Sequence, residues 1–398
     1  MRWSERVDAE LEKELVQWRR HLHSKPELSF QEHETTEFIG SLLAGWGIEI
    51  DRPLDTGLVG RVRGSEPGPV VAVRADIDAL PVQEENDADF ASTVSGRMHA
   101  CGHDGHTAIL LGLARTLSEL RPQLCGEIRL VFQPAEEVVA SGARQFVDVG
   151  VLDGVAAMLG LHLWSGLDVG SISLRGGAVM ASTDEFRVTV LGSGGHGAMP
   201  HQATDSLVIA SSLVGELQTL VSRRIDPLDP AVVSVGSFHA GTAFNVIPSA
   251  AELTGTVRTL SEPVRALIER ELGQIATSHV QAGGARAEVR YLRGNPTLVN
   301  DAGLVEVLRP ALAAVDGVEI VSLPPSMGGE DFAYYSQVVP CVFAFIGARN
   351  PEIGADFPHH HPRFSIDERS LGIGLRFFLA GVERLNSCSE RLPRFSKA

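Results

Sequence analysis

The sequence predicts an α/β protein of two domains, in which a small α+β domain is inserted into a larger one. The chain has 398 residues, which is more than one ordinary hydrophobic core accommodates. In its first part, near-continuous apolar strands alternate with helical stretches, a pattern typical of a mostly parallel sheet covered by helices. From about residue 184 the strands become half-exposed and follow the order β-α-β-β-α-β, which is ferredoxin-like.

The larger domain is expected at residues 1–183 and 295–398. An amphipathic helix that ends near Pro26 opens the chain, because apolar residues recur there at helical spacing: Val7, Leu11, Leu15, Trp18 and Leu22. A second helical stretch carries Phe38, Leu42 and Trp46. Three short apolar runs are expected to be strands: 69–78, 126–137 and 156–164.

The inserted domain is expected at residues 184–294. Alternation of apolar and polar residues predicts its strands, and apolar residues at helical spacing predict its helices. In chain order the expected elements are a strand at 185–193, a helix at 205–224, strands at 231–238 and 251–260, a helix at 262–280 and a strand at 285–292. Gly176-Gly177 and Gly294-Asn295 stand at its two ends, as hinges would.

Composition excludes several classes of protein. The 34 basic and 50 acidic residues give a net charge of −16, and the basic residues are scattered, which argues against nucleic acid or an anionic membrane as partner. The N-terminal residues contain no apolar segment of a secretory signal. No apolar run approaches the roughly 18 residues of a membrane span. The four cysteines are widely spaced, and we expect reduced thiols in a cytoplasmic protein.

The stretch "MHACGHDGHTA" contains Cys101, His103 and His106 within six residues. Further strong donors follow two of the predicted strands: Glu136-Glu137 after "LVFQPA", and His162 in "GLHLW". In an open α/β sheet the site lies outside the carboxyl ends of the strands, so these loops have the opportunity to converge. Thiolate, imidazole and carboxylate together suit a borderline divalent cation, Zn²⁺ foremost, with Mn²⁺ or Co²⁺ as alternatives.

Adjacent residues in an extended segment point to opposite sides. One carboxylate of Glu136-Glu137 is therefore able to bind a metal while the other faces an activated water, as metal-assisted hydrolysis requires. Simpler interpretations stay open for each residue alone. The acidic pair also suits a helix N-terminus, and Cys101 suits a buried apolar position. Three further simple interpretations are a satisfied core histidine at His162, a solvated loop at residues 359–361, and turn residues at Asp76 and Asp78.

Nine motifs together carry a family likeness. They are "HLHSKPELSFQEHETTEFI", "RADIDALPVQEEN", "MHACGHDGHTA", "LVFQPAEE", "GLHLW", "GGHGAMPHQATDSLV", "FNVIPSAAELTGTVRT", "GGEDFAYY" and "HHHPRFSIDE". In this order, from about residue 18 to residue 372, they resemble the N-acyl-amino-acid amidohydrolases of metallopeptidase family twenty. The likeness is to the subgroup of hippurate hydrolases and auxin-conjugate hydrolases. The resemblance implies a catalytic domain with two divalent metal ions and an inserted lid that dimerises.

The resemblance also implies ligands for the two metals. Cys101 resembles the ligand that bridges both ions, with His103 and His162 completing one site. Glu137 and a late histidine would complete the other. The family's late ligand stands two residues before a proline, which selects His360 and leaves His359 and His361 as rivals. Asp78 and His106 would orient the ligands, as metal sites require.

For catalysis, the resemblance implies that Glu136 is the general base and later the general acid. His196 in the lid would polarise the scissile carbonyl in the active site of the partner subunit, although a solvated loop residue is an equal reading of its surroundings. Asn245 and Arg258 are candidates for holding the free carboxylate of the substrate, and a structural role in the lid stays open for both.

We therefore expect hydrolysis of the amide that joins an acyl group to an amino acid, in a homodimer. Neither the acyl group nor the amino acid follows from the sequence. Two alternatives are a hydrolase with Cys101 as nucleophile, and a non-catalytic protein that binds amino-acid conjugates and holds a structural metal.

Overall fold

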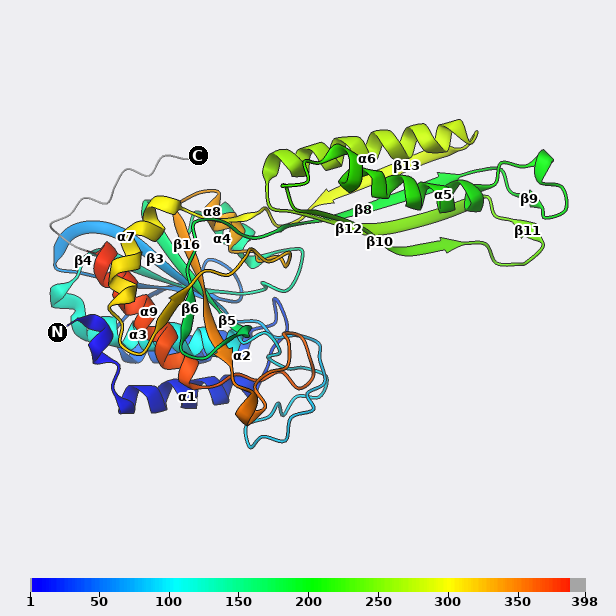
Figure 1. The fold of residues 1–398 in the computed structure, drawn as a ribbon. Coiled ribbons are helices and arrows are strands. Elements are labelled where there is room, and N and C mark those ends of the chain that lie inside the picture. The colour runs from blue at the N-terminus through cyan, green and yellow to red at the C-terminus, as the bar shows by residue number, and fades with distance from the viewer. Residues whose placement is uncertain (1, 387–398) are drawn as a thin grey trace. The chain divides into compact units, whose positions relative to one another are not determined.

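A computed structural model shows the fold and describes residues 2–386 (Figure 1). The chain forms two compact units. Unit 1 comprises Met1–Gly177, Val299–Pro324 and Tyr334–Ala398, and unit 2 comprises Ala178–Leu298 and Pro325–Ala333. Each unit has its own cluster of buried apolar side chains, so each is built as a domain.

The boundaries of unit 2 differ from the expected 184–294. Unit 2 begins six residues earlier and also includes a later segment, Pro325–Ala333. The later segment joins it through the backbone, because the amide of Ala181 donates to the carbonyls of Ser326 (3.0 Å) and Gly328 (2.9 Å). Such a return of the chain leaves no periodic signal in the sequence.

Unit 1 is built on an eight-stranded sheet in the order β1-β2-β4-β3-β5-β16-β6-β15. Its strands are β1 (Glu49–Asp51), β2 (Leu58–Arg63), β3 (Glu66–Asp76), β4 (Cys125–Gln133), β5 (Val155–Asp168), β6 (Ser171–Ser173), β15 (Glu319–Val321) and β16 (Cys341–Arg349). The central strands β4, β3, β5 and β16 are mutually parallel. The pairs β1–β2, β2–β4 and β16–β6 are antiparallel. The fold class is therefore α/β with a mixed sheet whose centre is parallel, as the buried apolar runs predict.

Several helices cover this sheet. The helical segments are η1 (Trp3–Arg6), α1 (Ala9–His23), α2 (His33–Gly45), α3 (His103–Leu120), η2 (Arg121–Gln123), α4 (Gly142–Asp148), α7 (Ala302–Ala313), α8 (Ala333–Ser336), η5 (Pro351–Ile353) and α9 (Arg369–Leu385). Helix α1 forms because Asp8 caps it by accepting from the amides of Glu10 and Leu11, and because Leu11 and Leu15 form its buried face. α1 packs on α3 and α9, and both of these pack on the sheet. Helix α3 is therefore buried almost throughout, and its first residues lie at the site described below.

Unit 2 contains a four-stranded antiparallel sheet in the order β10-β12-β8-β13. Its elements are β7 (Gly177–Met180), β8 (Ser182–Leu191), β9 (Gly195–His196), η3 (Pro200–Gln202), α5 (Ser206–Thr219), a π-helical turn η4 (Leu220–Arg224), β10 (Ala231–Ala240), β11 (Val246–Ile247), β12 (Ala250–Thr259), α6 (Glu262–Ala282) and β13 (Arg286–Arg293). The next strand, β14 (Leu298–Asn300), crosses the boundary, since only its first residue belongs to unit 2. Helices α5 and α6 contact each other and the same sheet. Along β8, Phe186, Val188 and Val190 are buried while Glu185 and Arg187 are exposed, which is the predicted alternation.

The chain closes the four-stranded part of unit 2 beside the place where it enters it. The amide of Thr183 donates to the carbonyl of Asn295, and the amide of Gly294 donates to the carbonyl of Thr183, each at 2.9 Å. A Cβ atom on Gly294 would lie 2.3 Å from the Thr183 carbonyl oxygen, so only glycine allows this approach.

The predictions about membrane spans and about reduced cysteines have different outcomes. No helix within residues 2–386 has the length and apolar character that a membrane span requires. Cys101 and Cys341 are free, but Cys125 is disulfide-bonded, so the expectation of a reduced thiol is wrong for this residue. Cysteines pair only where folding brings their Cα atoms within about 7 Å, and spacing along the chain does not reveal this. Cys388 lies outside the described residues, and the cytoplasmic location stays a prediction.

Candidate metal centre and active site

The predicted metal-binding residues of unit 1 gather at the carboxyl ends of its parallel strands. Asp76 ends β3 and Asp78 follows it, Glu136 and Glu137 follow β4, and His162 lies in β5 beyond its last pairing with β3. Two further segments complete the set. Cys101 precedes helix α3 and His103 is its first residue, and the loop after β16 carries His360. This is the edge of an open α/β sheet at which ligands bind.

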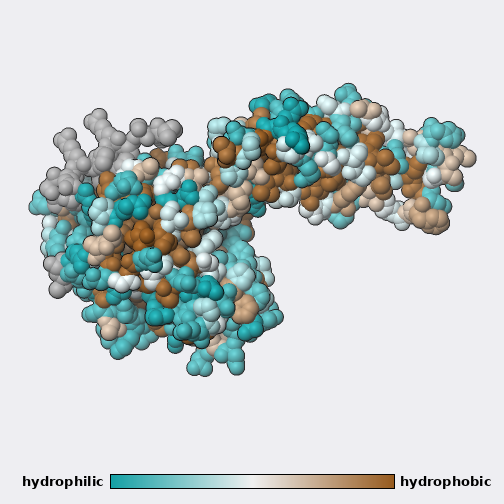
Figure 2. Space-filling model, viewed as in Figure 1, coloured by the Kyte–Doolittle hydropathy of each residue, from teal (hydrophilic) through white to brown (hydrophobic). Residues whose placement is uncertain are grey.

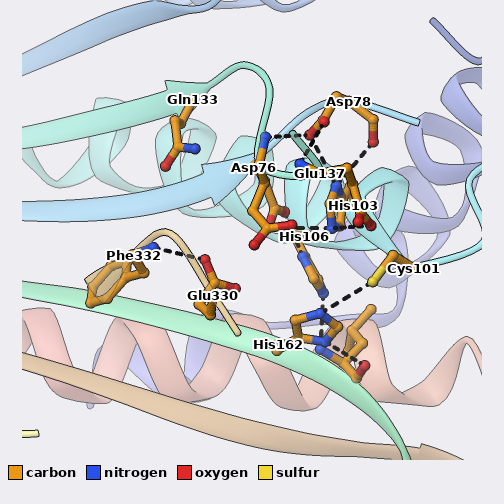
Figure 3. A network of polar contacts seen from close by, with 12 residues as sticks. Asp76, Asp78, Cys101, His103, His106, Gln133, Glu137, His162, Glu330 and Phe332 are labelled. Atoms are coloured by element: carbon orange, nitrogen blue, oxygen red, sulfur yellow. Dashed lines mark hydrogen bonds and ion pairs between the residues drawn. The ribbon is translucent and has the colours of Figure 1, made fainter. Parts of the chain in front are cut away.

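The first group of ligand atoms belongs to Cys101, His103 and His162, and all three lie within 4.8 Å of one another. The Sγ atom of Cys101 is 3.5 Å from Nε2 of His162. Nδ1 of His162 donates to the Leu163 carbonyl (2.8 Å) and Nδ1 of His103 to the Asp78 carbonyl (2.9 Å). These bonds leave the Nε2 lone pair of each ring available, and both rings face the same space as the sulfur (Figure 3).

The second group consists of Cys101, Glu137 and His360, again within 4.8 Å. Nε2 of His360 is 3.3 Å from Oε1 of Glu137, and this contact raises the pKa of His360. Cys101 thus belongs to both groups of potential ligands.

The structure separates the three consecutive histidines. His360 has a left-handed backbone (φ 66°), which turns its ring away from those of its neighbours. Nε2 of His359 instead accepts from the amide of Ser165 (3.3 Å). The ring of His361 stacks on Phe357 at 4.6 Å. Of the three, His360 alone occurs in a group of potential ligands within the described residues.

The electrostatics of the centre favour bound cations. Burial raises the pKa of the Cys101 thiol well above its usual range, and Glu137, Glu136 and Asp76 raise it further. Burial lowers the pKa of His103, but Asp76 and Asp78 outweigh burial and raise it to about 10. The pocket therefore concentrates negative charge around groups that bind metals only when deprotonated. Divalent cations bound here would supply positive charge, and the sulfur, nitrogen and oxygen donors suit Zn²⁺ or a similar ion.

The two residues expected to orient the ligands contact them directly or through the backbone. Asp78 accepts from Nδ1 of His103 through its carbonyl and, at 3.2 Å, through Oδ1. Nδ1 of His106 donates to Oδ1 of Asp76 (2.6 Å), while its Nε2 accepts from the amide of Leu163 (2.9 Å). Both nitrogens of His106 are engaged, so it fixes the strand that carries His162.

Part of this network is not predicted from the sequence. Asp76 is fully buried and lies 3.5 Å from Nε2 of His103, so the interpretation as a simple turn residue is wrong. Nη1 of Arg74 donates to Asp76 (2.8 Å), and its Nε donates to Oε1 of Gln133 (2.8 Å). The signal was present in the sequence: Arg74 is a lone cation within an apolar strand, where a charge persists only if it is paired.

The three predicted residues of unit 2 lie in two places. His196 on β9 pairs with Val246 on β11, and the amide of Gly197 donates to the carbonyl of Asn245 (2.8 Å). His196 and Asn245 are therefore exposed neighbours in one two-stranded ribbon. Arg258 lies on β12 and is half-buried. Within residues 2–386 no carboxylate lies at ion-pair distance from its guanidinium, and burial lowers its pKa.

The sequence model of the peptidase family M20/M25/M40 matches residues 72–384. The chain belongs to this family. The match confirms the resemblance drawn from the nine motifs, and it covers the segments that carry the potential metal ligands of this M20 protein.

Relatives and solved structures agree with the family assignment. The M20 protein is 48% identical to an N-acyl-L-amino acid amidohydrolase of Geobacillus stearothermophilus, over 74% of this chain and 80% of the relative. It is 38% identical to the IAA-amino acid hydrolase ILR1-like 4 of Arabidopsis thaliana, over 90% and 83%. A crystal structure from Bacillus subtilis, described as a dinuclear metal binding peptidase from the M20 family, superimposes with a TM-score of 0.84 at 38% identity. That match covers 96% of this chain and all of the other.

Proposed function

We propose that this M20 protein hydrolyses the amide bond of N-acyl amino acids and releases a carboxylic acid and a free amino acid. The observation that carries the proposal is the pair of ligand groups that share Cys101, with the carboxylate of Glu136 beside them. Ligand atoms of Glu136, Glu137 and His103 lie within 4.8 Å of one another. We propose two divalent ions per subunit, Zn²⁺ or Mn²⁺ with Co²⁺ as an alternative, held by Cys101, His103, Glu137, His162 and His360.

Bound divalent cations supply Lewis acidity, which polarises the scissile carbonyl and acidifies the attacking water. Glu136 accepts the proton of that water and later delivers it to the nitrogen of the leaving amine. His196 of the partner subunit donates a hydrogen bond to the oxygen on which negative charge develops, and each such donor is worth roughly 3–4 kcal/mol. Arg258 and Asn245 are the candidates for holding the free carboxylate of the substrate, Arg258 through two parallel hydrogen bonds.

The alternative of a cysteine nucleophile agrees poorly with the surroundings of Cys101. A nucleophilic cysteine needs a lowered pKa, whereas burial and three carboxylates raise the pKa of this thiol. Binding of a metal ion would offset this rise in the pKa of the thiol, since a coordinating thiol is deprotonated outright.

We also propose that unit 2 is a ferredoxin-like lid and dimerisation domain and that the catalytic domain is formed by unit 1. The strand order of unit 2 supports the ferredoxin-like fold, because β13-β8-β12-β10 is the arrangement that a split β-α-β produces. Apolar side chains at the surface of unit 2 support its role in dimerisation (Figure 2). Phe244 is fully exposed and Val246 is more than half exposed, beside His196 on the β9–β11 ribbon. A partner subunit would remove these side chains from water.

The experiment that tests this function compares a Glu136→Gln variant with the wild type, after metals are stripped and Zn²⁺, Mn²⁺ or Co²⁺ is added back. Substrates are N-acetyl, N-benzoyl and N-indole-acetyl amino acids. We expect metal content near that of the wild type and turnover lower by roughly 100- to 10,000-fold. Glu119→Gln, at an exposed position on α3, is the control and should keep full turnover. Unchanged turnover in Glu136→Gln removes this residue from the mechanism, and a wild type that hydrolyses none of these amides refutes the function.

A further inference from the structure

The motif "PELSFQE" belongs to the family likeness but has no part in the metal centre or the mechanism above. Its last residue, Glu32, has 0% exposure. Oε1 of Glu32 accepts a hydrogen bond from the amide of Ala135 at 2.9 Å, across 103 residues of sequence. Ala135 directly precedes Glu136 and Glu137, so Glu32 contacts the backbone from which both functional carboxylates project.

Asp78 holds the next two amides of the same segment. Its Oδ1 accepts from the amide of Glu136 and its Oδ2 from the amide of Glu137, each at 3.1 Å. Oδ2 also accepts from the hydroxyl of Ser29 (2.7 Å), which belongs to the same motif as Glu32. Three successive amides are therefore held by two buried carboxylates (Figure 3 shows Asp78 and Glu137). The motif supplies one of them, Glu32, and Ser29 of the motif donates a hydrogen bond to the other, Asp78.

The segment needs this restraint because of its backbone. Ala135 has φ 55°, in the left-handed region that residues with a Cβ atom rarely adopt. Such a conformation persists only when the surroundings over-determine it. Here the Ala135 carbonyl accepts from the amide of Gly142 (3.0 Å) while its own amide donates to Glu32. The peptide is fixed on both sides.

We propose that Glu32 is a positioning residue of the hydrolytic site, which holds Ala135 in the left-handed conformation and thereby directs the Glu136 and Glu137 side chains. It acts as a hydrogen-bond acceptor, and its charge is not required. Burial and the nearby Asp78 raise the pKa of Glu32 to about 7, so near neutral pH the group exists in both forms, and either form retains an acceptor for the amide. The role in catalysis rests on the proposed function, whereas the restraint on the segment does not.

Two substitutions of Glu32 separate an acceptor from a charge. Glu32→Gln keeps an oxygen at the same reach and removes the charge. Glu32→Asp keeps the charge but withdraws the oxygens by about 1.5 Å, one carbon–carbon bond, which is too far for the hydrogen bond to Ala135. We expect Glu32→Asp to lower kcat by roughly 10- to 100-fold with KM within about twofold of wild type. We expect Glu32→Gln to stay within about threefold of the wild-type kcat.

Glu27 provides the matched control. Its carboxylate also holds two backbone amides, those of Glu34 (3.1 Å) and Thr35 (2.8 Å), but these open helix α2 and do not belong to the site. Glu27→Asp should leave kcat unchanged. An equal loss of kcat in Glu27→Asp and Glu32→Asp would mean that any damage to this region acts through stability, and it would overturn the proposal.

Hydrogen exchange on the metal-free chain gives a second reading that needs no substrate. In Glu32→Asp the amides of residues 135–137 should exchange at least roughly tenfold faster than in the wild type, as a restrained segment does when it opens locally. In Glu32→Gln they should exchange at the wild-type rate. Wild-type exchange in Glu32→Asp overturns the proposal. If the wild type hydrolyses no N-acyl amino acid, the proposed function fails, and the exchange rates still decide whether Glu32 restrains the segment.

Discussion

Replacing Arg258 with methionine is expected to lower kcat/KM for N-acyl amino acids by roughly 100-fold. Arg258 lies on β12, between Thr183 of β8 and Val232 of β10. Burial lowers its pKa, and none of the described residues provides a carboxylate at ion-pair distance. A half-buried guanidinium that has no carboxylate at ion-pair distance is able to bind an anion from outside the chain. We expect this anion to be the free carboxylate of the substrate.

The magnitude follows from two hydrogen bonds. A hydrogen bond to a charged group contributes roughly 1.5–3 kcal/mol. Because the side chain is half-exposed, the lower end applies, and two parallel bonds give about 3 kcal/mol. Each 1.4 kcal/mol changes an equilibrium or rate constant about tenfold, which gives the expected factor of roughly 100.

The assay compares an N-acyl amino acid with its carboxamide, which lacks the charged group. In the wild type, kcat/KM should be higher for the acid. In Arg258→Met the acid should lose its advantage, while the value for the carboxamide should change little. Arg187→Met is the control, because Arg187 on the neighbouring strand β8 is exposed and paired with Glu252 at 3.5 Å. If Arg258→Met still prefers the acid as strongly as the wild type does, Arg258 does not hold the carboxylate.

Two further predictions concern the metals and pH. Cys101→Ala should lower the content of both ions, because Cys101 belongs to both ligand groups, whereas His162→Ala should lower only one. Elemental analysis after equilibration with Zn²⁺ checks this. Equal losses of zinc in the two variants would show that the thiolate is not shared. Burial raises the pKa of Glu32 from 4.5 to about 7 in the folded state, so its protonated form adds stability that is complete below pH 4.5 and is lost as pH rises through 7. Relative to Glu32→Gln, the unfolding free energy of the metal-free wild type should fall by about 3 kcal/mol over this range, and urea titrations that show a constant difference would contradict the assignment.

The sequence by itself determined the elements and the chemistry of the site. The buried apolar runs predicted β3, β4 and β5, and the later alternation predicted the strands and helices of unit 2 in their order. Both signals are local, since a periodicity of two or of 3.6 residues reflects which face of each element is buried. The donor types at Cys101, His103 and Glu136-Glu137 likewise pointed to a metal centre, because few other sites need thiol, imidazole and carboxylate together.

Only the tertiary structure decided which residues meet. Among three identical neighbours it brings His360 to Glu137, through one left-handed backbone angle. It turns Asp76 from a turn residue into a buried partner of His106, and it brings Glu32 to Ala135. The physical reason is that each of these contacts joins segments far apart in the chain. Its energy depends on distance and burial in the folded molecule, and neither quantity is recorded in the identity of a residue and its neighbours.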